Sequence, residues 1–390
     1  MCRIDRIVQN PIIFPDFILY ILSIDERRNF NLDLRKSGGS RRPGGCFPLE
    51  HAFAGDVERH LGFSFKTRCI KITVMTMMPP MNQLVWQKKG LILSPSEAPA
   101  WRSAHCGMTS VLPWSDNRLR VFLTGMDKGG QFQVGWLDLD QNFNVVRENP
   151  GNPVLPLGRM GCFDCRGMCM PTVVRVSETV LYMYYAGWGL TAPGLFVNQC
   201  GLAISRDNGE TWTKWSEAPL PMLDDKDPIG VGTVFVLPDP DGLWRMWYTT
   251  FREWRARPDG SWCHYYHIKY AESSDGIHWQ KPDNNMAIDF ENEDENVIGR
   301  PMVIKEKGFY RMWFSCRTLR TTYRIGYAES IDGRQWERKP SGIEPSVSGW
   351  DSEMVEYAYV VKRNQDYVMF YNGNGFGGSG TGVAIGTQAN

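Results

Sequence analysis

The feature that most constrains the fold of this chain is one strand-like segment that recurs along it. The segment reads "LRVFLTG" from Leu119, "LYMYYAGWG" from Leu181, "WRMWYTTF" from Trp244, "YRMWFSCR" from Tyr310 and "YVMFYNGNG" from Tyr367. Apolar and aromatic residues dominate every copy, and 3.6-residue periodicity is hard to find from residue 84 onward. Such self-similarity is typical of repeat architectures, so the chain is expected to repeat one unit five times.

Three further strands accompany each copy. An apolar strand precedes it, as in "VGTVFVLP" (Val231), a third strand follows, as in "IKYAESSD", and a fourth begins at a repeated tryptophan, as in "QWERKP". Four strands repeated five times predict an all-β fold, a five-bladed β-propeller of four-stranded antiparallel blades. The last copy lacks a fourth strand. We therefore predict that the similar segment "LVWQKKGLILSP" near residues 84–95 completes that blade and closes the ring, which hides strand edges.

A short hairpin marks the repeats. "SRDNGETW" (205–212) has the looser copies "SSDGIHW" and "SIDGRQW", each between the third and fourth strands of a repeat. Asp207 is suited to accept backbone N–H bonds and Gly209 to adopt a positive φ. We therefore predict a structural role for these hairpins, with Asp275 and Asp332 in the place of Asp207.

The first eighty residues differ from the repeats. They show no sustained period, and "RKSGGSRRPGG" (35–45) has the composition of a linker. We expect residues 1–80 to be a poorly ordered extension or an over-extended start, and residues 84–390 to form the propeller. The apolar stretch "FILYILSI" (17–24) is far short of the ~20 residues that span a bilayer, so neither a membrane span nor a signal peptide is predicted.

Charge and cysteine usage narrow the function classes. Lys plus Arg and Asp plus Glu both number 43, so no overall field attracts nucleic acid or an acidic membrane, and a neutral partner such as a sugar fits better. The 10 cysteines lack the spacing of a disulfide framework, which indicates reduced thiols and a cytoplasmic location. The cluster Cys162, Cys165 and Cys169 lacks a fourth ligand, so no metal and no cofactor are predicted.

Ionisable residues gather at the start of the first strand of each repeat, the strand that lines the central channel of a propeller. They are His105, Asp164, Arg166, Asp227, Glu295, Arg300, Asp351, Glu353 and Glu356. Several carboxylates around one pocket suit glycoside cleavage, where one protonates the leaving oxygen and another activates water or attacks the anomeric carbon. The channel is therefore expected to be polar and acidic.

Several motifs carry a family resemblance. They are "FDCRGMCMP", "YHIKYAESSDGIHW", "RIGYAESIDGRQW" and "GWDSEMVEY" followed by "FYNGNGFG". Over roughly residues 84 to 386 the chain resembles the glycosidase-related five-bladed propellers of bacterial polysaccharide gene clusters, relatives of glycoside hydrolase families 32, 43 and 130. The resemblance implies a glycosidase acting on an oligosaccharide or glycoconjugate. Its pattern places an Asp on blade one, where this sequence has His105.

The same resemblance assigns roles to residues. It implies Glu353 as the general acid, Asp164 as the base or transition-state stabiliser and Asp227 as a third carboxylate. Asp351 and Glu356 lie close enough in the sequence to take the role of Glu353. The residues expected to bind substrate are His105, Arg166, Trp188, His267, Arg300, Asp351 and Glu356.

Other interpretations stay open. Asp164 could cap a turn, Arg300 could pair with the acidic run "DFENEDEN", and Trp188 and His267 could only pack. A glycoside phosphorylase would use arginines for an anion, and the candidates are Arg166, Arg252, Arg300 and Arg317. A non-catalytic carbohydrate-binding propeller would explain the missing blade-one Asp. A sialidase-like enzyme would have six blades, and the repeat count is five.

Overall fold

The computed structural model describes residues 12–14, 17–24, 30–36, 84–190, 195–240 and 242–388. The chain divides into two compact units, Met1–Met81 and Asn82–Asn390. In the first unit the strands β1 (Ile12–Phe14), β2 (Phe17–Ile24) and β3 (Phe30–Lys36) form an antiparallel sheet in the order β1-β2-β3. The rest of the segment for which an extension or over-extended start is predicted lies outside the described residues.

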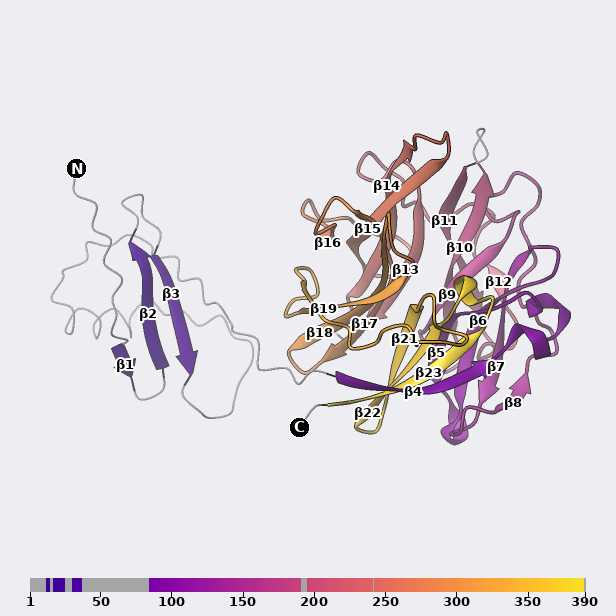
Figure 1. Cartoon of the computed structure of the whole chain (residues 1–390), viewed down its shortest axis with the longest axis horizontal. Coiled ribbons are helices and arrows are strands. Elements are labelled where there is room, and N and C mark those ends of the chain that lie inside the picture. Colours follow the sequence, from indigo (N-terminus) through magenta and orange to yellow (C-terminus); the bar gives the residue numbers. More distant parts are fainter. Residues whose placement is uncertain are drawn as a thin grey trace. The chain divides into compact units, whose positions relative to one another are not determined.

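The second unit is built of strands, so the all-β prediction is confirmed over its described residues. Its helical elements are the short 3-10 turns η1 (Pro95–Glu97), η2 (Ala100–Arg102), η3 (Ser115–Asn117) and η4 (Gly375–Gly377). The strands follow one another along the chain in four-stranded antiparallel groups (Figure 1). Neighbouring groups touch at isolated parallel bridges, such as Gln199 with Val231 and Tyr266 with Val297.

The groups have the following strands. One contains β5 (His105–Pro113), β6 (Leu119–Met126), β7 (Phe132–Leu139) and β8 (Val145–Glu148). The next contains β9 (Met168–Arg175), β10 (Leu181–Leu190), β11 (Phe196–Ser205) and β12 (Thr213–Lys214). Then come β13 (Val231–Pro238), β14 (Trp244–Ala256), β15 (Trp262–Ser273) and β16 (Met286–Ile288). These are followed by β17 (Glu295–Glu306), β18 (Phe309–Thr318), β19 (Arg324–Ser330) and β20 (Glu337–Lys339). The last contains β21 (Glu356–Arg363), β22 (Asp366–Asn372), β23 (Thr381–Gln388) and β4 (Leu84–Leu93).

The pairing of the first and last strands has the predicted form. β4 lies antiparallel to β23, from Leu84 opposite Gln388 to Leu93 opposite Thr381. The first strands β5, β9, β13, β17 and β21 contact one another in succession, and β21 contacts β5. No single closed sheet joins these described strands, so the blade count of five and the closed ring stay predictions.

One fourth strand begins later than predicted. In the third group the segment "HWQKP" forms only an isolated bridge between Glu272 and Gln280, and β16 starts at Met286. Pro282 lies between them and has no N–H to donate to a ladder, which explains the interruption.

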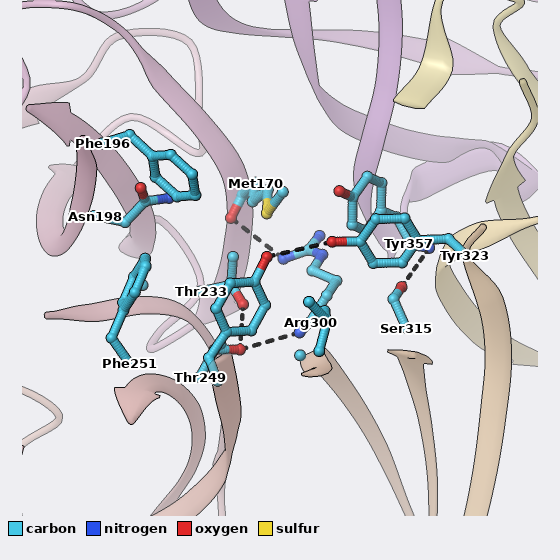
Figure 2. Close-up of a pocket in the computed structure, with 14 residues that line it drawn as sticks. Met170, Phe196, Asn198, Thr233, Thr249, Phe251, Arg300, Ser315, Tyr323 and Tyr357 are labelled. Carbon is cyan, nitrogen blue, oxygen red and sulfur yellow. Dashed lines mark hydrogen bonds between the residues drawn. The ribbon is translucent and has the colours of Figure 1, made fainter. Parts of the chain in front are cut away.

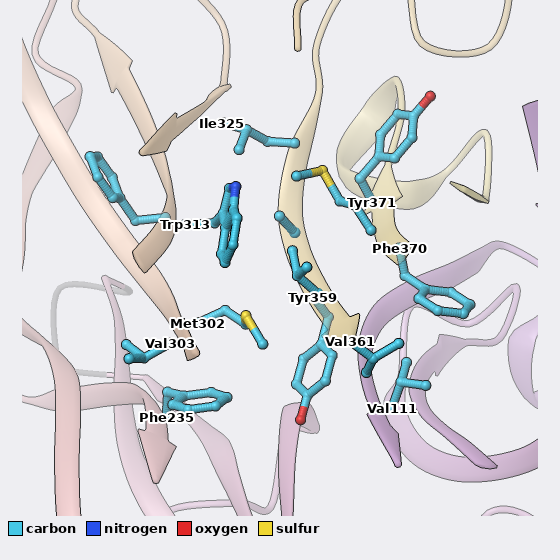
Figure 3. Close-up of a cluster of buried hydrophobic side chains, with 14 of the residues drawn as sticks. Val111, Phe235, Met302, Val303, Trp313, Ile325, Tyr359, Val361, Phe370 and Tyr371 are labelled. Carbon is cyan, nitrogen blue, oxygen red and sulfur yellow. The ribbon is translucent and has the colours of Figure 1, made fainter. Parts of the chain in front are cut away.

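Apolar side chains fill the spaces between neighbouring groups. The side chains of Trp136, Trp247 and Trp313 are fully buried. Figure 3 shows Phe235, Met302 and Trp313 on one side of a core region and Tyr359 and Val361 facing them from β21. Burial of aromatic and branched side chains is the main stabilising contribution, at about 25 cal/mol for each Å² removed from water.

The repeated hairpin has the predicted internal hydrogen bonds. Asp207 Oδ1 accepts from the Thr211 N–H at 2.9 Å, and Gly209, with φ 86°, donates to Ser205 Oγ at 2.8 Å. A donor on the second strand of the preceding group also reaches each hairpin. These contacts are Arg120 Nη1 to Asn208 O at 3.1 Å, Tyr184 OH to Gly276 O at 2.7 Å and Trp247 Nε1 to Gly333 O at 2.8 Å. The hairpins therefore fasten neighbouring groups together.

Candidate active site

A β-bulge interrupts the first strand of every group. The register shifts lie at Gly107/Ser110, Tyr184/Ala186, Val231/Val234, Gly299/Met302 and Glu356/Tyr359 of the paired strands. At four of the bulges a residue other than glycine has a positive φ: Met108 at 51°, Met170 at 54°, Arg300 at 52° and Tyr357 at 53°. A bulge re-aims a side chain, and this backbone conformation is unfavourable for residues with a Cβ. The same strained feature thus recurs on the strands that meet at the centre.

A side chain of the preceding group holds each of these four residues. The backbone N–H donors and their acceptors are Met108 to Asn372 Oδ1, Met170 to Thr124 Oγ1, Arg300 to Thr249 Oγ1 and Tyr357 to Ser315 Oγ, at 2.8–3.1 Å. Aligning the repeats places Ala186 at the equivalent position of β10, where the side chain offers no acceptor. The third group, with Gly232 and Thr233 at its bulge, lacks this contact.

A small pocket that is partly open to solvent lies beside that irregular position. Its lining residues lie on strands between β9 and β21, except Tyr323, which directly precedes β19: Met170, Phe196, Asn198, Gly232, Thr233, Thr249, Phe251, Tyr266, Val297, Gly299, Arg300, Ser315, Tyr323 and Tyr357. Figure 2 shows Phe196, Asn198 and Phe251 on one side of Arg300, with Tyr323 and Tyr357 on the other. None of these described lining residues is an aspartate or a glutamate.

Arg300 is the lining residue that the sequence predicted. Its guanidinium crosses from β17 to the first two groups, where Nη2 donates to Thr109 O at 2.7 Å and Pro171 O at 3.2 Å, and Nη1 to Met170 O at 3.2 Å. The predicted alternative of pairing with the acidic run at 289–296 is wrong for the side-chain contacts of this structure. Burial lowers the pKa of Arg300 to about 10, so the side chain stays charged at neutral pH.

Glu356 lies beside Tyr357 at the start of β21. Its side chain is completely buried, and neither carboxyl oxygen has a hydrogen-bond partner among the described residues. Burial raises the pKa of Glu356 well above its usual range, against the opposing effects of the Arg317 charge and of the Tyr357 side chain, which is near the carboxyl group but outside ordinary hydrogen-bond geometry. Burial also raises the pKa of Tyr323 and Tyr357 well above the usual value. A carboxyl group with a raised pKa therefore lies next to the tyrosine residues that line the pocket.

Arg317 and His264 extend this wall. Arg317 Nη2 lies 3.0 Å from His264 Nε2, and the guanidinium lies over the Tyr323 ring at 5.1 Å. Burial, together with the positive charge of Arg317, lowers the pKa of His264 to about 3, so His264 is neutral and accepts from the guanidinium. The Tyr266 and Tyr323 hydroxyls are 3.2 Å apart and share a hydrogen bond.

The predicted aspartates have a different environment. Asp164 accepts from Tyr185 OH at 3.0 Å and pairs with Lys214 Nζ at 2.6 Å. Asp351 accepts from Tyr371 OH at 3.0 Å and pairs with Lys88 Nζ at 2.6 Å. Both carboxyls are buried, and each ties the loop before a first strand to later strands of its own group.

Asp227 repeats this arrangement with two lysines. It accepts from Tyr248 OH at 2.9 Å and pairs with Lys269 Nζ at 2.8 Å and Lys281 Nζ at 2.7 Å. Burial raises the pKa of Asp227, but the hydrogen bonds from Lys269 and Lys281 outweigh it and hold the pKa at about 2. The roles predicted for Asp164 and Asp227 in catalysis stay predictions, and neither residue lines the pocket.

The other predicted residues do not converge on the pocket. Glu353 and Arg166 are exposed, and the Glu353 backbone N–H donates to Asn374 Oδ1 at 2.8 Å. His105 is buried at the start of β5, with Nε2 donating to the Phe376 carbonyl and its ring edge-on to Phe132. Burial lowers the pKa of His105 against hydrogen bonds to the Phe376 and Thr124 backbone.

Trp188 and His267 make packing contacts. The Trp188 ring lies between Phe132 at 5.7 Å and Phe196 at 5.2 Å, and its Nε1 donates to Cys169 Sγ at 2.9 Å. His267 Nδ1 lies 3.0 Å from Asp289 Oδ1, and burial lowers the pKa of His267 against that carboxylate. These geometries fit the packing alternatives for both residues.

Sequence reasoning missed most of the pocket. Asn198, Tyr266, Tyr323 and Tyr357 line the wall, yet no single-sequence pattern distinguishes them from ordinary strand residues. The available signal was the repeat alignment, which shows that Ala186 departs from the polar residues at the matching positions. Three lysine partners of the aspartates, Lys88, Lys214 and Lys281, each follow by two positions the tryptophan of the repeated fourth-strand segment, and Lys269 lies on β15.

The described residues hold neither a cluster of metal ligands nor a membrane-spanning helix. Within the described ranges no group of three or more His, Cys, Asp or Glu side chains is arranged to hold a metal ion. No described helix has the length and hydropathy needed to cross a bilayer.

Comparisons with known proteins give a family and a fold. No family model matches the sequence. The Mycobacterium tuberculosis (strain H37Rv) protein named "Uncharacterized protein Rv1502" is 34% identical over 306 residues, which cover 77% of this chain and 99% of the relative. A solved glycoside hydrolase has a TM-score of 0.59 at 16% identity, covering 80% of this chain and 92% of its own. A thermostable family-43 glycoside hydrolase has a TM-score of 0.52 at 16% identity, covering 72% and 88%. The fold is therefore that of the glycoside hydrolase propellers.

Proposed function

We propose that this chain, which belongs to the family of the Mycobacterium tuberculosis protein Rv1502, is a glycosidase-like enzyme with its site in the central pocket of a five-bladed propeller. The strand groups, the succession of first strands and the pairing of β4 with β23 support a closed ring. Likeness to glycoside hydrolase structures supports chemistry at a glycosidic bond. The proposed substrate is an oligosaccharide or glycoconjugate.

One observation carries the proposal: Glu356, a completely buried carboxyl group, has no partner in ordinary hydrogen-bond geometry among the described residues. Like the aspartates it is not itself a lining residue, but it directly precedes the lining residue Tyr357. Leaving a buried polar group unsatisfied is unfavourable by about 1–3 kcal/mol, so its retention suggests a function. Burial also raises the pKa of Glu356 well above its usual range, which favours the protonated form of the carboxyl group. A protonated carboxyl is the group that glycoside cleavage needs as an acid.

In the proposed reaction Glu356 donates its proton to the glycosidic oxygen as the bond from that oxygen to the anomeric carbon breaks. Water then supplies the hydroxyl group at the anomeric carbon, and its proton goes to a base. Asp164 and Asp227 are the predicted carboxylates for that step, and each would first have to be freed from its lysine. Glu353 is the second candidate for the acid, from an exposed position.

A second candidate function follows from the lining of the pocket. None of the described lining residues is a carboxylate, which leaves hydrolysis without a nearby base. Phosphorolysis avoids this need, because inorganic phosphate itself attacks the anomeric carbon while Glu356 protonates the leaving oxygen. A non-catalytic carbohydrate-binding propeller would need neither group.

A substrate screen tests these functions. The full chain is incubated with aryl glycosides and oligosaccharides, with and without inorganic phosphate, and released sugar and sugar phosphate are measured. Release of free sugar supports hydrolysis, and release that requires phosphate and yields sugar phosphate supports phosphorolysis. Glycan binding without release of either product would overturn the enzyme proposal in favour of a binding propeller.

A further inference from the structure

We infer that the pocket around Arg300 binds an oxyanion, supplied by a carboxylate-bearing sugar or by a free phosphate. The inference deepens the proposed function and rests on it, because it names the substrate class of the same pocket. It is carried by three features of the pocket: an unbalanced positive charge, hydroxyl groups that face the cavity with hydrogens to donate, and the lack of carboxylates among the described lining residues.

The positive charge belongs to the Arg300 guanidinium. Every acceptor that it reaches is neutral: the carbonyl oxygens of Thr109, Met170 and Pro171, and Thr172 Oγ1 at 3.4 Å. No carboxylate forms an ion pair with Arg300 among the described residues, and its side chain is only 3% exposed. These four hydrogen bonds use both terminal nitrogens, so the guanidinium acts on the pocket through its charge and not through a direct bond from Nη1 or Nη2. A buried charge without an opposite charge is unfavourable, so the pocket attracts an anion.

Hydroxyl groups supply donors next to this charge. Ser315 Oγ accepts the Tyr357 N–H at 2.8 Å, which leaves the Ser315 hydroxyl hydrogen to donate. Tyr266 and Tyr323 share one hydrogen bond at 3.2 Å, so one of their two hydroxyl hydrogens is not used by that contact. Hydrogen bonds from such donors to an ionised oxygen are roughly twice as strong as those between neutral groups.

The described lining residues include no carboxylate, and this favours binding of an anion over binding of a neutral sugar. The hydroxyl groups of a neutral sugar donate as well as accept, and carboxylates are the strongest side-chain acceptors for them. Here the one nearby carboxyl, Glu356, has a raised pKa and does not repel an anion while it is protonated. Arg317 adds a second positive charge behind Tyr323, and its buried Nε has no hydrogen-bond partner among the described residues.

Calorimetric titration of the full chain tests the inference with named probes. The probes are inorganic phosphate, D-glucuronate and D-galacturonate, and the matched neutral probes are D-glucose and D-galactose. We expect an anion to bind at least about tenfold more tightly than its neutral counterpart, as one hydrogen bond to a charged group provides. Preference for a uronate over phosphate assigns the anion to the sugar, and the reverse preference assigns it to phosphate. Equal or weaker binding of all the anions relative to the neutral sugars would overturn the inference.

Variants locate the binding to this pocket. Arg300→Met removes the charge, but it also removes bonds that join three groups, so a second variant is needed. Ser315→Ala combined with Tyr323→Phe removes two hydroxyl donors with little change in volume, and we expect anion affinity to fall about tenfold or more. Because Ser315 Oγ also accepts the Tyr357 N–H, Tyr323→Phe alone is measured beside it and should show part of the same loss. Arg206→Gln changes an exposed arginine in an outer hairpin and serves as the charge control, with affinity unchanged. Unchanged anion affinity in the folded Ser315/Tyr323 double variant would also contradict the inference.

The titration tests the anion site and the substrate screen tests the proposed enzyme, so either proposal can be contradicted without the other. Anion binding without cleavage of any glycan leaves the anion site standing and removes the proposed enzyme. Cleavage of neutral glycans without preferential anion binding leaves the enzyme standing and removes the anion site.

Discussion

Two kinds of carboxyl group lie near the starts of the first strands, and they differ in what surrounds them. Asp164, Asp227 and Asp351 each accept a tyrosine hydroxyl and pair with lysine within their own strand group. Glu356 is equally buried, yet neither of its oxygens has a hydrogen-bond partner among the described residues. Lysine side chains of the folded protein compensate the negative charge of each aspartate. Glu356 has no such partner among the described residues, so we propose that the substrate interacts with it.

The difference suggests how contacts that stabilise the repeats can be told apart from residues that take part in a reaction. A contact that recurs in several repeats serves the repeat, because each group must hold its own loop against its own strands. A buried polar group that occurs in only one repeat and lacks a hydrogen-bond partner is the better candidate for function. The shared Asp, Tyr and Lys contacts therefore support each repeat, and Glu356 is the acid that we propose, while the base role of Asp164 and Asp227 stays a prediction.

The largest expected effect is on catalysis. Glu356→Gln keeps the shape of the side chain but removes the proton donor, so we expect glycan turnover to fall about 10² to 10⁴-fold. The measurement is steady-state turnover of a substrate found by the screen, with circular dichroism to establish that the fold is unchanged.

Glu353→Gln is the matched comparison, because it makes the same chemical change on an exposed carboxyl of the same segment. Near wild-type turnover in this variant, with loss in Glu356→Gln, supports the assignment. The opposite pattern would restore Glu353 as the acid and remove Glu356 from that role.

The next effect is on stability. Asp227→Asn leaves Lys269 without its carboxylate and Lys281 with only the more exposed Asp224 at 3.0 Å, and both amines are largely buried. Breaking a buried ion pair by removing one partner is strongly destabilising, so we expect the free energy of unfolding to fall by about 3 kcal/mol. Urea denaturation measures it. Asp283→Asn is the control, because the ion pair of Asp283 with Lys226 is exposed. An equal loss of stability in this variant would contradict the claim that burial makes the Asp227 ion pairs more stabilising.

The two carboxyls should respond oppositely to pH. The pKa of Asp227 lies at about 2 in the folded protein, below its unfolded value, so its stabilisation of about 2 kcal/mol is present above pH ~4 and is lost as pH falls toward 2. The pKa of folded Glu356 lies above its unfolded value, so its contribution is complete below pH ~4 and is lost as pH rises.

Urea denaturation of the wild type and the two variants over this pH range measures the contrast. Relative to Glu356→Gln, the wild type should lose stability as pH rises from about 4 to 7. Relative to Asp227→Asn, it should lose stability as pH falls from about 4 to 2. Parallel pH dependence in all three proteins would contradict the comparison.

The strands could be predicted because their signal is local and repeated. Alternating apolar segments and the hairpin motif fix the order of the strands, and the similarity of residues 84–95 to other fourth strands identified the partner of β23. The start of β16 was missed because Pro282 interrupts the ladder within an otherwise matching segment.

The site was harder to predict because its contacts join distant residues. Asp164 pairs with Lys214 and Asp351 pairs with Lys88, and the residues next to each aspartate in the sequence do not indicate which lysine it contacts. Single-sequence reasoning therefore selected carboxylates by their position before a first strand, which the aspartates and Glu356 share. Only the spatial arrangement shows which carboxyl is left without a partner.

The smallest expected effect concerns the outer hairpins, where another set of repeated carboxylates is fully used. Asp332 Oδ1 accepts from the N–H groups of Arg334 at 2.8 Å and Gln335 at 2.9 Å and from Ser330 Oγ at 3.0 Å. Because the side chain is exposed, we expect Asp332→Ala to lower the free energy of unfolding by only about 1 kcal/mol in urea denaturation, with turnover unchanged. Asp332→Asn keeps an acceptor oxygen and should lose less. A marked loss of turnover in either variant would show that repeated carboxylates, and not only the unpartnered one, contribute to chemistry.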